Sequence, residues 1–159
     1  TSVTGSASVA ETVTRYAHEN NVPFTLAFAL MWAESRFDPF AVNRNPGSID
    51  RGLFQLNSDS FPHLSIEDFF DIEINVRTGL SYLKFCLEQG EAEIIGLAIY
   101  NAGHYRVSSA GAPMMTLEHI SKILTYKAEL ERDFQRYISR NGKIRADQKS
   151  GGSLVNQKF

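Results

Sequence analysis

The sequence has little cysteine and little excess charge, and each scarcity excludes a class of protein. A single cysteine, Cys86, excludes an internal disulfide. Because Cys86 lies in a predicted helix, we expect it to be a small buried apolar residue. The formal net charge of −2 excludes a strongly basic surface for nucleic acid or an anionic membrane. No apolar run approaches the length that spans a bilayer. The chain begins with neither Met nor a signal-like segment, which indicates a processed product or an excised domain.

The 159 residues are enough for one domain with a hydrophobic core, and the apolar pattern is mostly helical. Apolar spacing and capping residues predict helices over 8–19, 23–36, 71–89, 91–100 and 116–138. Between them, the residues rich in Asn, Pro, Gly and Ser at 39–64 predict a long ordered loop that contains a short hairpin or a helical turn, and 104–115 predict a second loop. We expect a flexible segment over 1–7, a folded domain over 8–138, and a flexible tail or linker over 139–159.

One carboxylate stands at the end of the most apolar helix. The run VPFTLAFALMWA is almost wholly apolar, and Glu34 follows it directly. Apolar burial and the negative end of the helix dipole both disfavour the charged form, so we expect a raised pKa for Glu34. A carboxyl that keeps its proton near neutral pH is a general acid. The alternative is an ordinary glutamate that reaches solvent from a helix end.

Three stretches, taken in order, resemble a known family. They are ESRFDPFAVNRNPGSIDRGLFQLNS from Glu34, YNAG from Tyr100, and YKAEL from Tyr126. Their order and spacing resemble the catalytic domain of the soluble lytic transglycosylases (SLT), in the lysozyme-like superfamily, over roughly residues 8–138. The resemblance implies a mainly α, lysozyme-like fold of the α+β superfamily, with a long active-site loop.

The same resemblance implies a reaction on peptidoglycan. The family cleaves the β-1,4 bond between N-acetylmuramic acid and N-acetylglucosamine and closes a 1,6-anhydro ring, with no cofactor and no metal. Glu34 is then the single catalytic residue, acting first as acid and then as base. The implied partner is the glycan strand, with a flagellar or secretion-system assembly as a further candidate. The implied location is periplasmic or otherwise extracytoplasmic.

Further positions are assigned residue by residue from the resemblance. Gln55 is expected to hydrogen-bond sugar, Tyr100 and Asn101 to line the sugar site, and the Tyr126 hydroxyl to lie near Glu34. Ser35 is expected to support the loop or the sugar. Without the resemblance, the alternative for Asn101 is a helix C-cap, and the alternative for Tyr126 is an ordinary tyrosine at the edge of the core.

Asp50 leaves the reaction open. An Asp just before the Gly-Leu-Phe-Gln element also resembles the second carboxylate of lysozymes, with which hydrolysis becomes an alternative. The alternative for Asp50 is a purely structural role, as a loop residue that makes turn hydrogen bonds or pairs with Arg44 or Arg51. A third alternative, from another class, is a non-catalytic glycan-binding module of a cell-envelope assembly.

The four histidines show no spacing typical of a metal site. They are His18, His63, His104 and His119. None of them stands at a metal-binding distance along the chain from Cys86 or from paired acids. Of the four, only His104 lies beside a motif, and we expect a loop or cleft-rim position for it.

Overall fold

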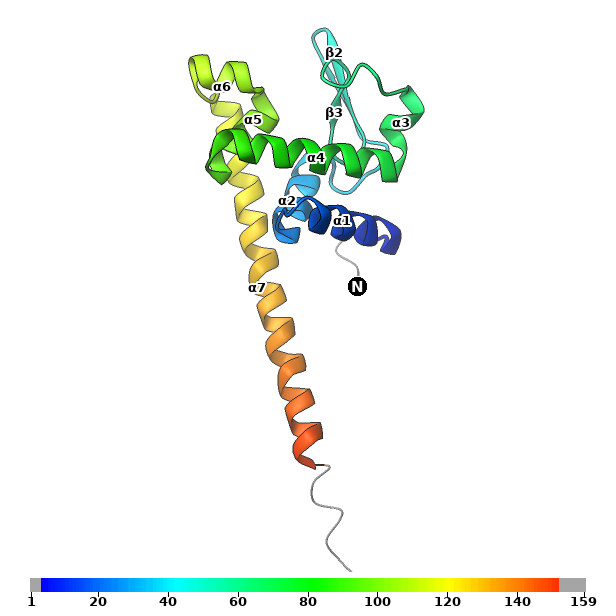
Figure 1. The fold of residues 1–159 in the computed structure, drawn as a ribbon, viewed down its shortest axis with the longest axis vertical. Helices are drawn as coiled ribbons and strands as arrows, with labels where there is room; N and C mark the ends of the chain where they lie inside the picture. Colours follow the sequence, from blue (N-terminus) through cyan, green and yellow to red (C-terminus); the bar gives the residue numbers. More distant parts are fainter. Residues whose placement is uncertain (1–3, 152–159) are drawn as a thin grey trace, which may run out of the picture.

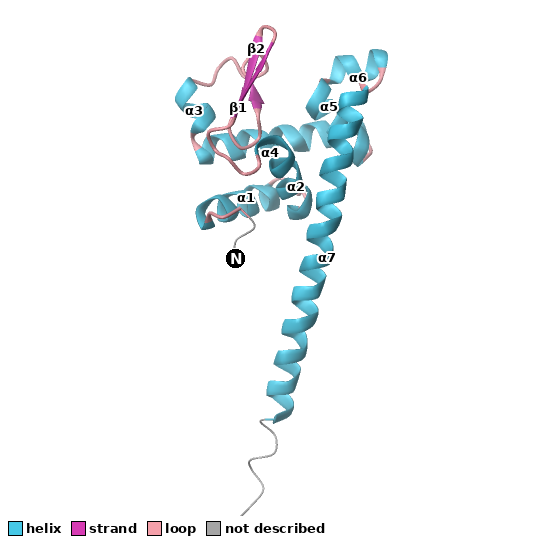
Figure 2. Ribbon diagram, turned by 180° about the vertical axis from the view of Figure 1, so that it is seen from behind, coloured by secondary structure: helices cyan, strands magenta, loops and turns pink. Residues whose placement is uncertain are grey.

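The computed structural model describes residues 4–151, with side chains as far as residue 141. Its elements in chain order are α1 (Ala7–Glu19), α2 (Phe24–Ser35), β1 (Val42–Asn45), β2 (Ser48–Arg51), β3 (Leu56–Asn57), α3 (Ile66–Phe70), α4 (Ile72–Gly90), α5 (Glu93–Ala102), α6 (His104–Ala110) and α7 (Met114–Gly151). The mainly helical architecture with a small hairpin is confirmed (Figures 1 and 2).

Helix α2 forms the centre of the hydrophobic core. All seven residues from Thr25 to Met31 are buried, so the helix is covered on every side. A helix that is apolar all round belongs in a core. Helices α1 and α7 pack directly on α2, while α4 packs on α1 and α5 (Figure 1). The last turn of α2 carries Glu34 out of this core and into the cleft described below.

The end of α2 is formed by left-handed backbone without a glycine. Arg36 has φ 55° and Phe37 has φ 68°, which reverses the chain immediately after Ser35. The Arg36 guanidinium lies 3.5 Å from the ring centroid of Trp32. This cation–π contact stabilises the turn that terminates the helix.

A small antiparallel sheet occupies the predicted long loop. Its strand order is β1-β2-β3, and Asp50 in β2 pairs with Asn43 on one side and Asn57 on the other. Figures 1 and 2 show the sheet and α3 together at one end of α4. Because paired residues on adjacent strands point to the same face, this register brings Asp50 between two asparagines.

Helix α4 holds the loop between β2 and β3 through buried contacts. Asn75, which is 1% exposed, accepts a hydrogen bond from Phe54 N and donates to the carbonyls of Arg51 and Phe69. The ring of Phe54 lies directly against Gly79, where a side chain would clash with it. These contacts fix the loop that faces Glu34.

Two elements differ from the sequence-based expectation. Residues 104–110 form the short helix α6, where a loop was expected. Helix α7 continues to Gly151, so the expected domain boundary at residue 138 lies inside a helix. Residues 139–149 contain no proline and mostly good helix formers, which explains the continuation. Of the flexible segments predicted at 1–7 and 139–159, residues 1–3 and 152–159 lie outside the described residues.

Helix α7 is the longest element and leaves the domain. Its first turns pack on α2 and α5, and its later turns project away from the other helices (Figure 1). Among residues 4–151, no helix combines the length and the apolar character that crossing a membrane requires.

Candidate active site

Glu34 lies where the apolar helix meets a polar cleft. Its side chain is 12% exposed, and it comes from the last turn of α2, after the buried residues Leu30 and Met31. The carboxyl therefore has apolar surroundings on the helix side and the cleft on the other. The apolar run predicted a buried helix before Glu34, whereas the sequence alone left open whether the carboxyl reaches solvent.

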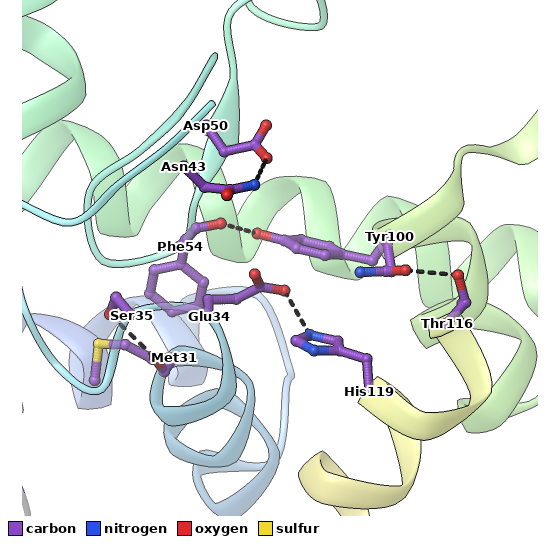
Figure 3. A network of polar contacts seen from close by, with 10 residues as sticks. Met31, Glu34, Ser35, Asn43, Asp50, Phe54, Tyr100, Thr116 and His119 are labelled. Atoms are coloured by element: carbon purple, nitrogen blue, oxygen red, sulfur yellow. Dashed lines mark hydrogen bonds and ion pairs between the residues drawn. The ribbon is translucent and has the colours of Figure 1, made fainter. Parts of the chain in front are cut away.

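The Glu34 carboxyl is bound by a histidine from a distant element. His119 Nε2 lies 3.1 Å from Glu34 Oε1, and the histidine side chain is 20% exposed. Figure 3 shows the imidazole reaching from α7 to the end of α2. This contact is not among the predicted ones, because the spacing of the histidines along the chain bears only on metal binding. The available signal was weak: His119 immediately precedes the buried Ile120 on an amphipathic helix.

The cleft beside Glu34 has a volume of about 510 Å³. Its walls come from the sheet, from the loops around β3, from α4 and α5, and from Glu34 of α2 and Met115 of α7. Its polar lining is mostly amides and carboxylates: Glu34, Asn43, Asn45, Asp50, Gln55, Asn57 and Asn101. A cavity with amide donors and acceptors on rigid elements is suited to a ligand rich in hydroxyl and acetamido groups.

Aromatic side chains form the other part of the cleft wall. Phe61 and Tyr82 meet edge to face with centroids 5.5 Å apart, and Tyr82 lies 5.2 Å from Tyr100. All three line the cleft. Burial raises the pKa of Tyr82 to about 12, so its hydroxyl keeps its proton. Phe61 and Tyr82 are not among the predicted site residues, because only tertiary packing brings them together.

Asp50 is held by three asparagine amides. Its Oδ2 accepts hydrogen bonds from Asn45 Nδ2 at 2.7 Å and from Asn43 Nδ2 at 3.2 Å, and its Oδ1 accepts one from Asn57 Nδ2 at 2.7 Å. The pairing with Arg44 or Arg51 considered from the sequence is not found among the described ion pairs. Three donors occupy most of the four lone-pair sites of the carboxylate.

Gln55 lines the cleft but also binds its own loop. Its φ of 46° places the backbone in the left-handed region, and its Nε2 donates to the carbonyls of Ala41 (3.1 Å) and Gly52 (2.9 Å). The side chain thus ties the loop before β3 to the segment before β1. The Gln55 Oε1 atom has no hydrogen-bond partner among the described residues, so it can accept a hydrogen bond from a ligand.

Tyr100 and Asn101, from the last turns of α5, also line the cleft. The Tyr100 hydroxyl donates to the carbonyl of Phe54 at 2.9 Å, and Asn101 Oδ1 accepts from Thr116 Oγ1 at 2.7 Å. Burial, followed by the neighbouring Glu34 carboxyl, raises the pKa of Tyr100 well above its ordinary value. Tyr100 therefore remains a hydrogen-bond donor across the working pH range. Helix α5 ends at Ala102, and Gly103 follows it with a positive φ of 85°.

Ser35 and Tyr126 are not brought to this cleft. Ser35 is buried, and its Oγ donates back to the carbonyl of Met31 at 3.1 Å within α2. Tyr126 stacks on Trp32, with centroids 4.4 Å apart and an interplanar angle of 12°, and it lines a separate hollow. The hydrogen bond that Tyr126 was expected to make with Glu34 is made instead by His119, two turns earlier on α7.

Comparisons with known proteins point to one family. Residues 11–121 match the family described as the transglycosylase SLT domain. The chain is 28% identical over 105 residues to a membrane-bound lytic murein transglycosylase F from Desulfosudis oleivorans (strain DSM 6200 / JCM 39069 / Hxd3), an alignment that covers 62% of this chain and 22% of that protein.

The fold is similar to solved lytic transglycosylases. The structure of an inactive mutant of lytic transglycosylase Slt from Pseudomonas aeruginosa matches with a TM-score of 0.65 and 21% identity, over 79% of this chain and 24% of that one. The 70 kDa soluble lytic transglycosylase from Escherichia coli matches with a TM-score of 0.65 and 24% identity, over 74% and 23%. The chain thus spans about a quarter of the length of these relatives. Because the family match covers most of the chain, this protein belongs to the transglycosylase SLT domain family.

Proposed function

We propose that this chain is a peptidoglycan lytic transglycosylase with Glu34 as its single acid and base. The observation that carries the proposal is the position of Glu34: a nearly buried carboxyl at the wall of an amide-lined cleft, in a chain of the SLT family. The substrate is the glycan strand, cleaved between N-acetylmuramic acid and N-acetylglucosamine. The proposed location is extracytoplasmic, where peptidoglycan lies.

In the first step, Glu34 gives its proton to the glycosidic oxygen. The bond from the muramyl anomeric carbon to that oxygen breaks through an oxocarbenium-like state, and N-acetylglucosamine leaves with a free 4-hydroxyl. The Glu34 carboxylate then takes the proton from the muramyl C6 hydroxyl, whose oxygen attacks the anomeric carbon. The 1,6-anhydro ring closes, Glu34 regains its proton, and no water is consumed.

The cleft residues have separate proposed roles. Asn101 and the free oxygen of Gln55 hydrogen-bond the sugars, while the rings of Phe61 and Tyr82 offer apolar surface to the sugar faces. Tyr100 supports the loop that carries Gln55 through its bond to Phe54. This division places proton transfer on one side chain and substrate binding on its neighbours.

Lysozyme-type hydrolysis is the second candidate, because Asp50 lines the same cleft as Glu34. A nucleophilic carboxylate needs a lone pair free to approach the anomeric carbon. The three amides on Asp50 favour a different role, in which the carboxylate holds the hairpin and the asparagines in place. This arrangement supports the transglycosylase.

Product analysis separates the candidates. Purified sacculi are digested with the chain, and the released muropeptides are identified by mass spectrometry. A transglycosylase releases 1,6-anhydro products, each lighter by one water than the reducing products of a lysozyme. Reducing ends would overturn the proposal in favour of hydrolysis, and sugar binding without any cleavage would favour the non-catalytic binding module. Association with a flagellar or secretion-system assembly remains a prediction.

A further inference from the structure

We propose that His119 is the positioning residue of the catalytic carboxyl, holding Glu34 through Nε2 and stabilising its ionised form between the two proton transfers. This inference rests on the proposed function of Glu34. Throughout the residues whose side chains are described, His119 is the one that hydrogen-bonds the Glu34 carboxyl. His119 is absent from the residues that line the cleft, so it acts through Glu34.

The contact leaves the reacting oxygen free. Glu34 Oε1 binds His119, whereas Oε2 has no hydrogen-bond partner among the described residues. A proton on Oε2 is therefore available to a ligand in the cleft, while Oε1 accepts the N–H of a neutral imidazole. When the proton leaves, the same N–H donates to a full carboxylate, and a charge-assisted hydrogen bond is about twice as strong as a neutral one.

This change in strength is what makes the contact relevant to the rate. An interaction that is stronger once charge has developed lowers the barrier, while one that is equal in both states only improves binding. Glu34 carries its negative charge after the first transfer and loses it in the second. The His119 bond is therefore strongest in the interval between the two proton transfers.

The backbone around His119 is fixed on both sides, so the imidazole has a defined approach. Three residues earlier, Thr116 is buried and bonded to Asn101 of α5. On the other side, Ile120 and Ile123 are buried in the core. One turn further, Lys127 forms a 2.8 Å ion pair with Glu93 at the start of α5. Helix α7 is thereby held against the elements that carry the cleft.

The other polar groups near Glu34 are engaged elsewhere. Tyr100 donates to the Phe54 carbonyl, and the Gln55 amide donates to two loop carbonyls. The Asp50 carboxylate accepts hydrogen bonds from three asparagine side chains. Tyr126 faces Trp32 in a separate hollow. His119 is therefore the donor that the packing directs to the acid.

Three variants of His119 test the role in the full chain. His119→Phe keeps a ring of similar size but removes the donor, His119→Gln places an amide N–H at about the reach of Nε2, and His119→Asn has the amide on a side chain too short to reach. On soluble glycan strands, we expect kcat to fall about 10- to 100-fold in the Phe and Asn variants, with KM nearly unchanged. The Gln variant should recover most of that loss. His18→Phe, on the exposed face of α1, is the matched control.

The outcomes separate this inference from the proposed function. If the native chain cleaves glycan and His119→Phe cleaves it at the native rate, or if Gln rescues no better than Asn, the positioning role is overturned. If the native chain does not cleave at all, the proposed function fails. The contact itself is then tested by the imidazole ¹⁵N shifts of His119, which must change in Glu34→Gln; unchanged shifts overturn the inference on their own.

Discussion

The hydroxyl of Tyr100 donates a 2.9 Å hydrogen bond to the main-chain carbonyl of Phe54, which joins α5 to the loop before β3. Tyr100→Phe leaves that buried carbonyl without its partner. We expect the free energy of unfolding to fall by about 1–3 kcal/mol, measured by urea titration. Cleavage should weaken as well, because the same loop carries Gln55. Tyr137→Phe, at an exposed tyrosine of α7, should leave both properties unchanged.

Glu34→Gln tests the acid and base directly. The amide matches the carboxyl in shape but cannot exchange a proton in either step, so we expect cleavage to fall at least about 100-fold. Thermal unfolding and glycan binding should stay close to native values. Glu118→Gln, at an exposed glutamate of α7, is the control for loss of one negative charge. A fully active Glu34→Gln would remove Glu34 from the mechanism.

Asp50→Asn tests whether the second carboxylate is chemical or structural. In this variant an NH₂ group replaces one carboxylate oxygen. It then faces asparagine NH₂ groups that donate hydrogen bonds to the native carboxylate. We expect the variant to lose about 1–3 kcal/mol of stability, to bind glycan more weakly, and still to release anhydro products. The matched control is Asp59→Asn, at an exposed aspartate just after β3. Abolished cleavage in a stable Asp50→Asn protein would identify Asp50 as a catalytic group.

Gly52→Ala tests the close approach of the cleft loop to α4. Gly52 has φ 76°, and an added Cβ would clash with the Asn75 side chain and the Phe69 carbonyl. Gly47 in the β1–β2 turn has a similar φ of 88° but open space around it. Gly47→Ala should therefore lose only about 1–2 kcal/mol from the unfavourable backbone, while Gly52→Ala loses clearly more, as measured by chemical unfolding. Equal losses of unfolding free energy in the two variants would mean that the loop can move away from Asn75 and Phe69 at little cost.

The contact between α1 and α4 predicts a dependence of stability on pH. Hydrogen bonds from Tyr16, and then from Arg15, lower the pKa of Glu73. A carboxyl with a lowered folded pKa stabilises the fold above its unfolded value of about 4.3, and this contribution is lost as the pH falls through the folded value. Glu73→Gln should thus reduce stability at neutral pH and make little difference in acid.

Urea titrations across the acid range measure that difference. Glu88→Gln, on the same helix and exposed, should keep the native pH dependence. A Glu73→Gln protein whose stability falls in acid as steeply as the native chain would contradict the assignment.

The sequence predicted the features that are encoded locally. The apolar run before Glu34 indicated a buried helix that ends close to a carboxylate, and the apolar spacing over 71–89 indicated the helix that the structure places at Ile72–Gly90. Such signals depend on residues within one or two turns of each other. They therefore survive without knowledge of the tertiary fold.

What the sequence did not predict depends on contacts between distant elements. His119 and Glu34 are 85 positions apart, and Asn75 serves the loop around Phe54 from 21 positions away. The sequence around His119 and around Asn75 has no local pattern that indicates the partner of either residue. The Asn–Asp–Asn arrangement also needed the strand register, because only the pairing of β1, β2 and β3 aligns Asn43, Asp50 and Asn57.

The two carboxylates of the cleft are supported by separate parts of the molecule. Glu34 depends on the core helix and on α7, whereas Asp50 depends on the amides of the three strands. Substitutions in the hairpin can therefore change the polar lining of the cleft without disturbing the packing that positions Glu34. The hairpin can therefore tolerate changes of side chain that the helical frame around Glu34 cannot.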